Sequence, residues 1–517
     1  MSIITAYVIT FIASFCILVI EIVAGRILAP FVGVSLYTWT SIIGVVLAGI
    51  SIGAYFGGKL ADRFPRRKTL GWLLLISGIA TLLIPPVTNL VAGHPFPTSL
   101  MVRILIVTAI TFFIPSTILG MISPVVVKLA LNNFETAGNV VGKIYAFSTL
   151  GSIIGTFAAG FFLISWIGTR HILLVMGGIL IVTALVWGSI MKSTKPVVWF
   201  ILFPSVLLLS TYDRAFRPPV DAYASYYKES DYYTIKVKKS LSVDKKTELK
   251  ALVLDNLLHS YVNLHDPLHI EYPYERIYSE VFHWKFVRGS SFKSLTIGGG
   301  GYTFPRYMET SYPNSEIDVV EIDPEVTKAV YTHLGLPGDT KIRTYNEDGR
   351  WFVMNCKTRY DVIFIDAYND LSMPYHLTTK EFAQLLKDIM EPEGILLTNI
   401  IDSFPKGAFL PSYIRTLQEV FGEGNVHLIS IFPNFEGSRI STFVVMTGRG
   451  KVDIRGFESY VRTGLGERAT SAVVPEDVKD AFMKKSYSVV LSDDYAPVDN
   501  LIAPIFEARF GYNRRAR

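Results

Sequence analysis

Acidic residues are almost absent from the first 212 residues of the chain. Only three of its 44 aspartates and glutamates lie there, at Glu21, Asp62 and Glu135, against 12 lysines and arginines. Long apolar runs fill the intervals, and a bilayer core about 30 Å thick needs about 20 apolar residues per helix. Residues 1–212 are therefore predicted to form a multi-pass α-helical membrane domain.

Six apolar stretches in this part are long enough to cross a bilayer, and a seventh is shorter. The six are residues 3–22, 37–60, 69–91, 101–122, 144–167 and 171–191, and the seventh is 197–210. A helix as short as the seventh stretch reaches only about 21 Å, so this stretch either spans the bilayer or lies at its surface. We expect six or seven spans in a cell-membrane protein.

Basic residues predict the orientation of these spans. Lysines and arginines gather between the second and third stretches, and the positive-inside rule places such a loop in the cytoplasm. With six spans, the residues after 212 face the cytosolic pool of adenosylated cofactors; with seven, they lie outside the cell. We expect the cytosolic arrangement.

The same basic loop carries a first resemblance. Residues 58–68, GKLADRFPRRK, are similar to the cytoplasmic loop between the second and third helices of major facilitator transporters. Six or seven spans fall short of that family's usual twelve, and few ionisable residues lie where coupled transport needs them. We expect the membrane half to anchor the rest of the chain or to deliver substrate to it. Close helix packing is predicted by glycines at every fourth position, namely Gly49, Gly53 and Gly57, and Gly151 and Gly155.

The remainder of the chain has the charge balance of a soluble protein, with 41 acidic and 37 basic residues. The lysines and arginines of the first half lie between apolar segments, as they do in the loops of membrane proteins. No nucleic-acid partner is therefore expected. Cys16 and Cys356 fall in different halves and predict neither a disulfide framework nor a cysteine metal site. We expect a linker and small β-strand domain at 213–290 and a catalytic domain at 291–517.

From residue 294 onward, short apolar runs alternate with helical stretches. The predicted strands are 294–297, 317–322, 341–344, 361–365 and 395–399, with helices at 324–333 and 380–390, and strands 426–431 and 441–446 close the sheet as an antiparallel edge. Near-continuous apolar strands alternating with helices are typical of a parallel sheet covered on both faces. The sequence therefore predicts an α/β, Rossmann-like, doubly wound sheet.

Glycines or carboxylates follow four of these strands in succession. They are Gly298 to Gly301, then Glu321 and Asp323, then the run from Asn346 to Gly349, and finally the run from Asp366 to Asp370. In an open parallel sheet, ligands bind at the carboxyl ends of the strands, and glycines there let the backbone approach a phosphate or a nucleoside closely. A carboxylate after the second strand can accept hydrogen bonds from two ribose hydroxyls. We therefore predict a nucleoside site at this edge.

The order of these motifs carries a second and broader resemblance. GGGG, VVEID, NEDG and YDVIFIDA are similar to the class I S-adenosylmethionine-binding fold. Together with LDNLLH at 254–259 and YSE at 278–280, they resemble the polyamine aminopropyltransferases, the spermidine synthase family, over residues 225–450. With the apolar first half, the chain resembles the membrane-fused branch of that family.

This resemblance implies roles for individual residues. The donor, S-adenosylmethionine or its decarboxylated form, would be bound by Gly298, Gly299, Gly300, Gly301, Glu321, Asp348, Gly349 and His259. Glu321 would hold the ribose hydroxyls and Asp348 the adenine amine, while Asp366 would be the catalytic residue facing the attacking amine. The acceptor would contact Tyr278, Glu280, Tyr368, Asn369, Asp370 and Asp494. The acceptor would be a small-molecule amine or a lipid-soluble molecule, membrane lipid would surround the first half, no metal would take part, and the protein would be a homodimer.

The chain departs from the family pattern at the glycine turn. The family reads GGGDGG, whose aspartate holds the amine of the donor's aminopropyl arm, whereas here Gly301 is followed by Tyr302. His259 replaces the family glutamine, and the second acid of the catalytic loop is displaced to Asn369-Asp370. Asp494 lies in a segment that could supply another acidic contact or form a polar turn. Two alternatives stay open: transfer of a methyl or other alkyl group, and a transporter or sensor that binds the nucleoside without turnover.

Overall fold

The structure is a computed structural model of the whole chain. It describes residues 1–92, 96, 98–131, 133, 135–189, 224–255, 257–287, 289–369, 371–404, 406–431 and 440–510. The predicted seventh apolar stretch, 197–210, and most of the predicted linker lie outside the described residues. The chain divides into two compact units, Met1–Ala222 with Glu229–Tyr232 and Phe510–Arg517, and Tyr223–Lys228 with Tyr233–Arg509.

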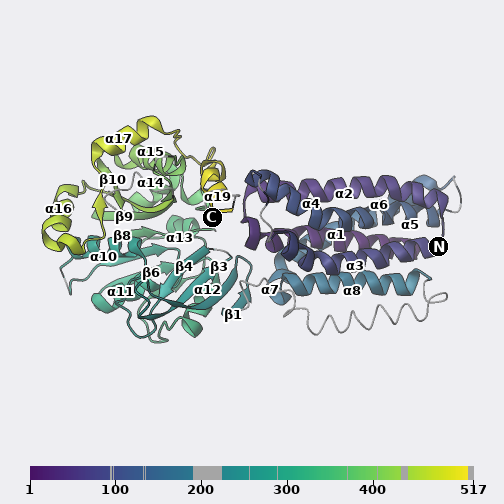
Figure 1. Ribbon diagram of the computed structural model, residues 1–517, viewed down its shortest axis with the longest axis horizontal. Coiled ribbons are helices and arrows are strands. Elements are labelled where there is room, and N and C mark those ends of the chain that lie inside the picture. Colours follow the sequence, from purple (N-terminus) through teal and green to yellow (C-terminus); the bar gives the residue numbers. More distant parts are fainter. Residues whose placement is uncertain are drawn as a thin grey trace. The chain divides into compact units, whose positions relative to one another are not determined.

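The first unit is a bundle of long apolar helices (Figure 1). Its helices are α1 (Ile3–Val32), α2 (Leu36–Arg63), α3 (Arg67–Ala92), α4 (Leu100–Gly120), α5 (Ile122–Ala130), α6 (Ala137–Ala158), the π-helix η1 (Ala159–Leu163), α7 (Ile164–Ile167) and α8 (Thr169–Trp187). Within the described residues, six helices are long and apolar enough to cross a membrane, with α4–α5 and α6–α7 each counted as one. The predicted multi-pass helical domain is confirmed.

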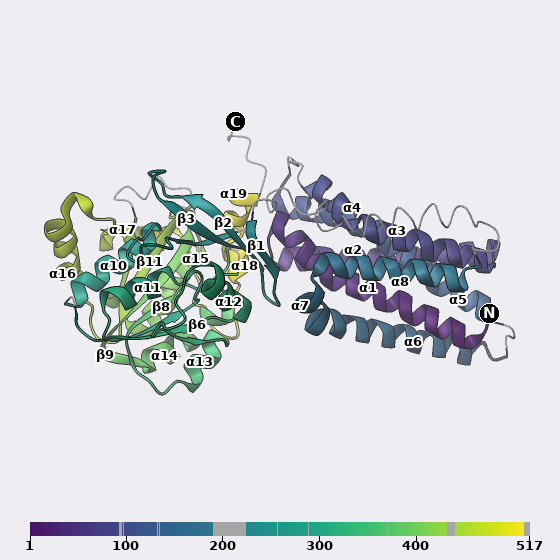
Figure 2. The ribbon, with the colours of Figure 1, turned by 90° about the horizontal axis from the view of Figure 1, so that it is seen from below.

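The glycine rows lie where two helices touch. A Cβ at Gly53 would come within 2.1 Å of the Thr117 carbonyl oxygen on α4, and one at Gly151 within 2.3 Å of the Phe11 carbonyl oxygen on α1. No side chain fits in such gaps, so only glycine permits these backbone approaches. Figure 2 shows α1 between α6 and α8. The predicted packing role of these glycines is therefore confirmed.

The second unit begins with a four-stranded sheet. Its strands, in spatial order, are β1 (Ala224–Glu229), β2 (Thr234–Leu241), β3 (Glu248–Leu254) and β4 (Leu257–Val262). The pairings of β2 with β3 and of β3 with β4 are antiparallel. The predicted short β-strands are therefore present, in one compact unit with the main sheet, and they are followed by helix α10 (Pro273–Lys285).

The main sheet has eight strands in the order β12-β10-β11-β9-β8-β5-β6-β7. The strands are β5 (Lys293–Ile297), β6 (Glu316–Val320), β7 (Arg343–Tyr345), β8 (Tyr360–Ile365), β9 (Met390–Asp402), β10 (Val426–Ser430), β11 (Ser441–Gly448) and β12 (Ala472–Val473). The five strands from β7 to β9 run parallel, whereas β11, β10 and β12 pair antiparallel. The strand order reverses between β5 and β8, and ligands bind at such a switch point in sheets of this kind.

Helices cover both faces of this sheet. They are α11 (Thr303–Ser311), α12 (Pro324–His333), α13 (Gly349–Asn355), α14 (Lys380–Asp388), α15 (Phe409–Phe421), α16 (Ile454–Ser459), α17 (Glu476–Lys485), α18 (Val498–Leu501) and α19 (Ala503–Phe510). In Figure 1, α14 and α15 lie on one side of the sheet, and α10 and α11 on the other. The predicted doubly wound α/β fold is confirmed.

The aromatic core of the unit lies between α10, α11 and the sheet. Phe282 of α10, Phe304 of α11 and Phe364 of β8 are buried in one hydrophobic cluster, with ring centroids 5.1–5.6 Å apart. Offset and edge-on rings at such distances contribute beyond their buried area. This packing fixes α10 against β8, and so it fixes the first turn of α10 next to the strand end that carries Asp366.

Several predicted boundaries are wrong, and the strands predicted at 317–322 and 395–399 are Glu316–Val320 and Met390–Asp402. The helix predicted to reach residue 390 ends at Asp388, and Met390 already pairs with Tyr360 in the sheet. The strand predicted at 341–344 is Arg343–Tyr345, because Thr340 and the backbone of Lys341 are held by the Glu309 carboxylate instead. The antiparallel closure of the sheet is confirmed, with the two-residue strand β12 added outside β10.

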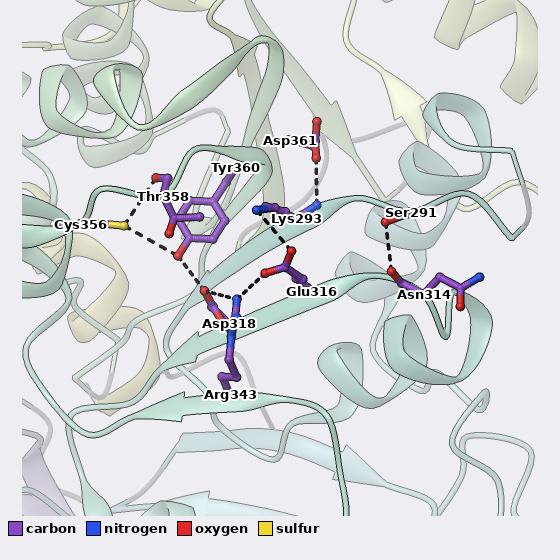
Figure 3. Close-up of polar contacts among 10 residues, drawn as sticks. All are labelled: Ser291, Lys293, Asn314, Glu316, Asp318, Arg343, Cys356, Thr358, Tyr360 and Asp361. Carbon is purple, nitrogen blue, oxygen red and sulfur yellow. Dashed lines mark hydrogen bonds and ion pairs between the residues drawn. The ribbon is translucent and has the colours of Figure 1, made fainter.

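An ion-pair network lies at the opposite edge of the sheet, where the parallel strands begin (Figure 3). Asp318 of β6 is buried and accepts two hydrogen bonds from the Arg343 guanidinium, at 2.6 and 3.1 Å. The Tyr360 hydroxyl donates to the same carboxylate at 2.8 Å. Three strands are thereby joined through one carboxylate, at the edge remote from the nucleoside motifs.

Candidate active site

The glycine turn after β5 brings the backbones of two strand ends together. Gly298 has φ +97°, and a Cβ there would lie 2.4 Å from the carbonyl oxygen of Asp366, at the end of β8. Gly300 is also left-handed, with φ +49°, a conformation that glycine adopts without strain. The predicted glycines therefore allow close backbone contact between the carboxyl ends of the parallel strands β5 and β8.

Glu321, just beyond β6, is buried beneath this turn. Its Oε2 accepts hydrogen bonds from the N–H groups of Gly299 (2.9 Å) and Gly300 (3.3 Å), and its Oε1 accepts from Asp323 N–H (3.1 Å). Burial raises the pKa of the Glu321 carboxyl to about 7, against the effect of these hydrogen bonds. The structure thus places the carboxylate directly against the glycine turn, at the switch point.

Asp348 begins helix α13. Its Oδ1 accepts hydrogen bonds from the N–H groups of Arg350 and Trp351, at 2.9 and 3.0 Å, which caps the helix. Its Oδ2 lies 2.9 Å from His376 Nε2. A Cβ on the next residue, Gly349, would come within 2.6 Å of Ile297 on β5. The glycine therefore lets α13 start against the strand that leads into the turn.

Strand β4 of the small sheet lies against the glycine turn. The Ser260 hydroxyl accepts a hydrogen bond from Gly301 N–H at 2.8 Å, and the Thr303 hydroxyl donates to the Tyr261 carbonyl at 3.1 Å. His259 is half-buried on the same strand, with its ring 6.4 Å from that of Tyr233. Ser260 was not predicted as a site residue, although it follows His259 in the motif.

Asp366, at the tip of β8, is held by two side chains. Its Oδ2 accepts a hydrogen bond from the Tyr274 hydroxyl at 2.8 Å, and its Oδ1 accepts from Asn399 Nδ2 at 2.7 Å. Burial raises the pKa of this carboxyl to about 7, while both hydrogen bonds act in the opposite direction. A carboxyl with a pKa near neutrality can take up and release protons, as a general base must.

Tyr368 supports this arrangement from behind. Its hydroxyl donates to the Asn399 carbonyl at 2.7 Å and accepts from Ile401 N–H at 3.1 Å. Its own carbonyl accepts from the Tyr233 hydroxyl at 3.3 Å. Tyr368 therefore orients the end of β9 that carries Asn399. Asn399, in turn, is the residue that bonds to Asp366.

Comparison with known families agrees with this geometry. A sequence profile of the spermine/spermidine synthase domain matches residues 280–454, which include the glycine turn, Glu321, Asp348 and Asp366. Residues 280–454 are thus similar to the spermine/spermidine synthase domain. A profile of the major facilitator superfamily matches residues 3–220, so that resemblance extends across the membrane half, beyond the one basic loop. The two matches lie one after the other, in the order predicted for the membrane-fused form.

The individual relatives have low sequence identity to this chain. The probable polyamine aminopropyl transferase of Bifidobacterium longum is 29% identical over 40% of this chain and 48% of that protein. Polyamine aminopropyltransferase 2 of Aquifex aeolicus is 21% identical over 79% of this chain and 81% of that protein. A probable spermidine synthase structure from Corynebacterium glutamicum covers 53% of this chain and 97% of its own, with 20% identity and a TM-score of 0.44. The chain spans about half the length of the first of these relatives.

Three side chains near Asp366 were not predicted from the sequence. Tyr274 and Asn399 bond to Asp366, and the carboxyl of Glu275 is close enough for the Asp366 charge to raise its pKa. The family resemblance was assigned one helical turn later, at Tyr278 to Glu280. A local signal was present, because Pro273 marks the first turn of a helix.

Only some of the predicted substrate contacts lie near Asp366. Tyr278 is one of them, because its ring lies 5.6 Å from that of Tyr274, which bonds to Asp366. Glu280 instead accepts hydrogen bonds from Thr470 and Ser471 N–H at 2.7 and 2.8 Å. Asn369 forms a tight turn with Ser372, and Asp494 is exposed beside Asp493, which pairs with Arg350. Asp370 lies outside the described residues. In the part of the chain that the structure describes, no cluster of three or more potential ligands is placed to hold a metal ion.

Proposed function

We propose that this chain transfers an aminopropyl group from decarboxylated S-adenosylmethionine to an amine and releases methylthioadenosine. The observation that carries the proposal is the half-buried Asp366 carboxylate at the switch point, beside the glycine turn and held by Tyr274 and Asn399. The match to the spermine/spermidine synthase domain and the two relatives named as aminopropyl transferases support it.

The nucleoside would lie across the strand ends. In this proposal Glu321, beneath the glycine turn, accepts hydrogen bonds from the ribose hydroxyls, and Asp348, which is about one-third exposed, accepts one from the adenine amine. The glycine turn leaves room for the backbone to approach the ligand, because a side chain at Gly298 or Gly301 would collide with Asp366 or Ser260. His259, on β4, is placed at the other side of the turn.

The chemical step needs an aligned amine and a proton acceptor. The amine nitrogen attacks the propyl carbon on the sulfonium; a C–N bond forms, the C–S bond breaks, and its electron pair goes to sulfur, which leaves as the neutral thioether of methylthioadenosine. The nitrogen gives its proton to the Asp366 carboxylate. A sulfonium carbon is already electrophilic, so alignment and proton transfer are the enzyme's main contributions.

The test is turnover by the purified full-length protein. With decarboxylated S-adenosylmethionine and 1,4-diaminobutane, we expect methylthioadenosine to form. Asp366→Asn should lower the rate about 10²–10⁴-fold, the usual contribution of general-base catalysis. A rate in Asp366→Asn equal to that of the wild type would contradict the assignment of the base.

The glycine turn favours one second candidate. It carries no carboxylate for an aminopropyl amine, since Tyr302 follows Gly301 and its buried hydroxyl donates to Thr344. Methyl or another alkyl transfer to a lipid-soluble acceptor would need no such carboxylate. S-adenosylhomocysteine as the product, formed from S-adenosylmethionine, would select this candidate.

A further inference from the structure

Unpartnered polar atoms gather around Asp366. Glu275 Oε2, Tyr278 Oη and Asn399 Oδ1 are all buried and have no hydrogen-bond partner among the described residues. Their residues are 5%, 2% and 4% exposed, respectively. Buried polar atoms in native proteins are nearly always paired, so three orphans in one place indicate an absent ligand.

These atoms come from two elements that meet at Asp366. Tyr274, Glu275 and Tyr278 lie on the first turns of α10, and Asn399 lies near the end of β9. Tyr274 and Asn399 each donate to one oxygen of Asp366. The Asp366 charge adds to burial in raising the pKa of both Glu275 and Tyr278. The orphan atoms therefore surround the carboxylate that the proposed reaction uses.

The chemistry of the orphans identifies the absent group as a hydrogen-bond donor. An ionised Glu275 and the carbonyl oxygen of Asn399 can only accept hydrogen bonds, and the Tyr278 oxygen can accept as well as donate. A primary ammonium offers three donors and no acceptor. It would satisfy these atoms and would also carry a positive charge to balance the buried Glu275 and half-buried Asp366 carboxylates.

The charges at the site also indicate that the absent group is a cation. Burial and the Asp366 charge both raise the pKa of Glu275, so a nearby cation would favour ionisation of both carboxyl groups. Neither Asp366 nor Glu275 forms an ion pair with a lysine or arginine in the described part of the chain. The glycine turn supplies no charge either. We therefore expect the substrate to supply a positively charged group at this site.

We propose that Glu275, with Tyr278 and Asn399, binds a primary ammonium group of the substrate, beside the amine that Asp366 deprotonates. The inference rests on the proposed function. The ammonium comes from the far end of an aliphatic diamine acceptor or from the aminopropyl arm of the donor. Glu275 is a positioning residue: it holds the charged end of an alkyl chain so that the reacting atoms meet at Asp366.

Glu275→Gln tests the proposal because it keeps the shape of the side chain and removes its charge. Calorimetry on the full-length protein with methylthioadenosine bound should show 1,4-diaminobutane binding at least about tenfold more weakly, the usual effect of losing a charge-assisted hydrogen bond. The preference for this diamine over 1-aminobutane should shrink by the same factor. Tyr278→Phe should weaken diamine binding by a smaller factor.

A second arm separates the two sources of the ammonium. If Glu275→Gln weakens decarboxylated S-adenosylmethionine and leaves the diamine unchanged, the residue holds the donor's arm. The control is Glu309→Gln, because Glu309 lies on α11 and bonds to Thr340 and Lys341 in the loop before β7. The control should alter neither affinity.

Unchanged affinity for both amine ligands in folded Glu275→Gln would overturn the proposal. In kinetics, Glu275→Gln should raise KM for the amine more than it lowers kcat, whereas Asp366→Asn should act mainly on kcat. A wild-type protein that binds the diamine through Glu275 but makes no methylthioadenosine would instead refute the proposed function and leave the ammonium site standing.

Discussion

At the scale of the residue, the site depends on side chains from distant parts of the sequence. Asp366 meets Tyr274 from 92 residues earlier and Asn399 from 33 residues later. A motif reading finds Asp366, because a carboxylate after a buried strand is a local pattern. It cannot find Asn399 or Glu275, since only the folded sheet and the packing of α10 bring them there.

The titration of Asp366 should be visible in the stability of the ligand-free protein. Its pKa is about 7 in the folded state, against 3.8 as the ordinary value, so the folded state binds more protons between these values. Stability should therefore fall as pH rises from about 4 to 7. In Asp366→Asn this fall should be smaller, as measured by the midpoint of thermal unfolding at pH 4, 6 and 8. Identical pH profiles for both proteins would contradict the buried titration.

Glu321 should make nucleoside binding depend on pH. Below about pH 7 its carboxyl is protonated, and it then loses the charge that strengthens bonds from ribose hydroxyls. Methylthioadenosine should bind more tightly at pH 8 than at pH 6, and Glu321→Ala should bind at least about tenfold more weakly at pH 8. Calorimetry at both pH values measures this. If Glu321→Ala binds methylthioadenosine with full affinity, Glu321 does not bind the ribose.

At the scale of the element, much of the sheet could be predicted from local signals. Helix α12 was predicted at its observed bounds, since Asp323 caps it and Pro324 begins it. Helix α10 was not identified, because five of its 13 residues are aromatic or histidine and its core contacts come from tertiary packing. The order of β10, β11 and β12 also depends on pairing that no single segment encodes.

The glycine turn can be tested as an element by comparing two glycines. Gly298→Ala places a Cβ 2.4 Å from the Asp366 carbonyl oxygen at φ +97°, so it should displace the tip of β8. We expect a loss of about 1–3 kcal/mol in stability and of most turnover. Gly338→Ala is the matched control, because nothing lies within 4 Å of its Cβ. Equal effects of the two substitutions would show that the close contact between Gly298 and Asp366 is not critical for stability or turnover.

The ion-pair network should stabilise the opposite edge of the sheet. Arg343→Ala leaves the buried Asp318 without its guanidinium partner, which should cost about 1.5–3 kcal/mol in the free energy of unfolding. Arg359→Ala removes an exposed arginine nearby in the sequence and should have little effect. Thermal unfolding of both variants measures the difference, and adding Asp318→Asn to Arg343→Ala should recover part of the loss.

At the scale of the whole molecule, the side of the membrane on which the catalytic unit lies decides its access to substrate. We propose the cytosolic side, supported by six described spans and by the basic residues that flank α2 and α3. A cysteine introduced at Lys245, on the exposed turn between β2 and β3, should react with an impermeant maleimide only after cells are broken. Labelling in intact cells would place the unit outside.

Strand β11 has a consequence for how the chain is made. It lies between β9 and β10, although it follows both in sequence, so during synthesis β9 presents an open strand edge until residues 441–448 leave the ribosome. An open edge of thirteen residues, Met390–Asp402, is a template for wrong pairing between nascent chains. Chains that stop short of Ser441 should therefore aggregate on polysomes, and quality-control proteases should recognise them by that edge.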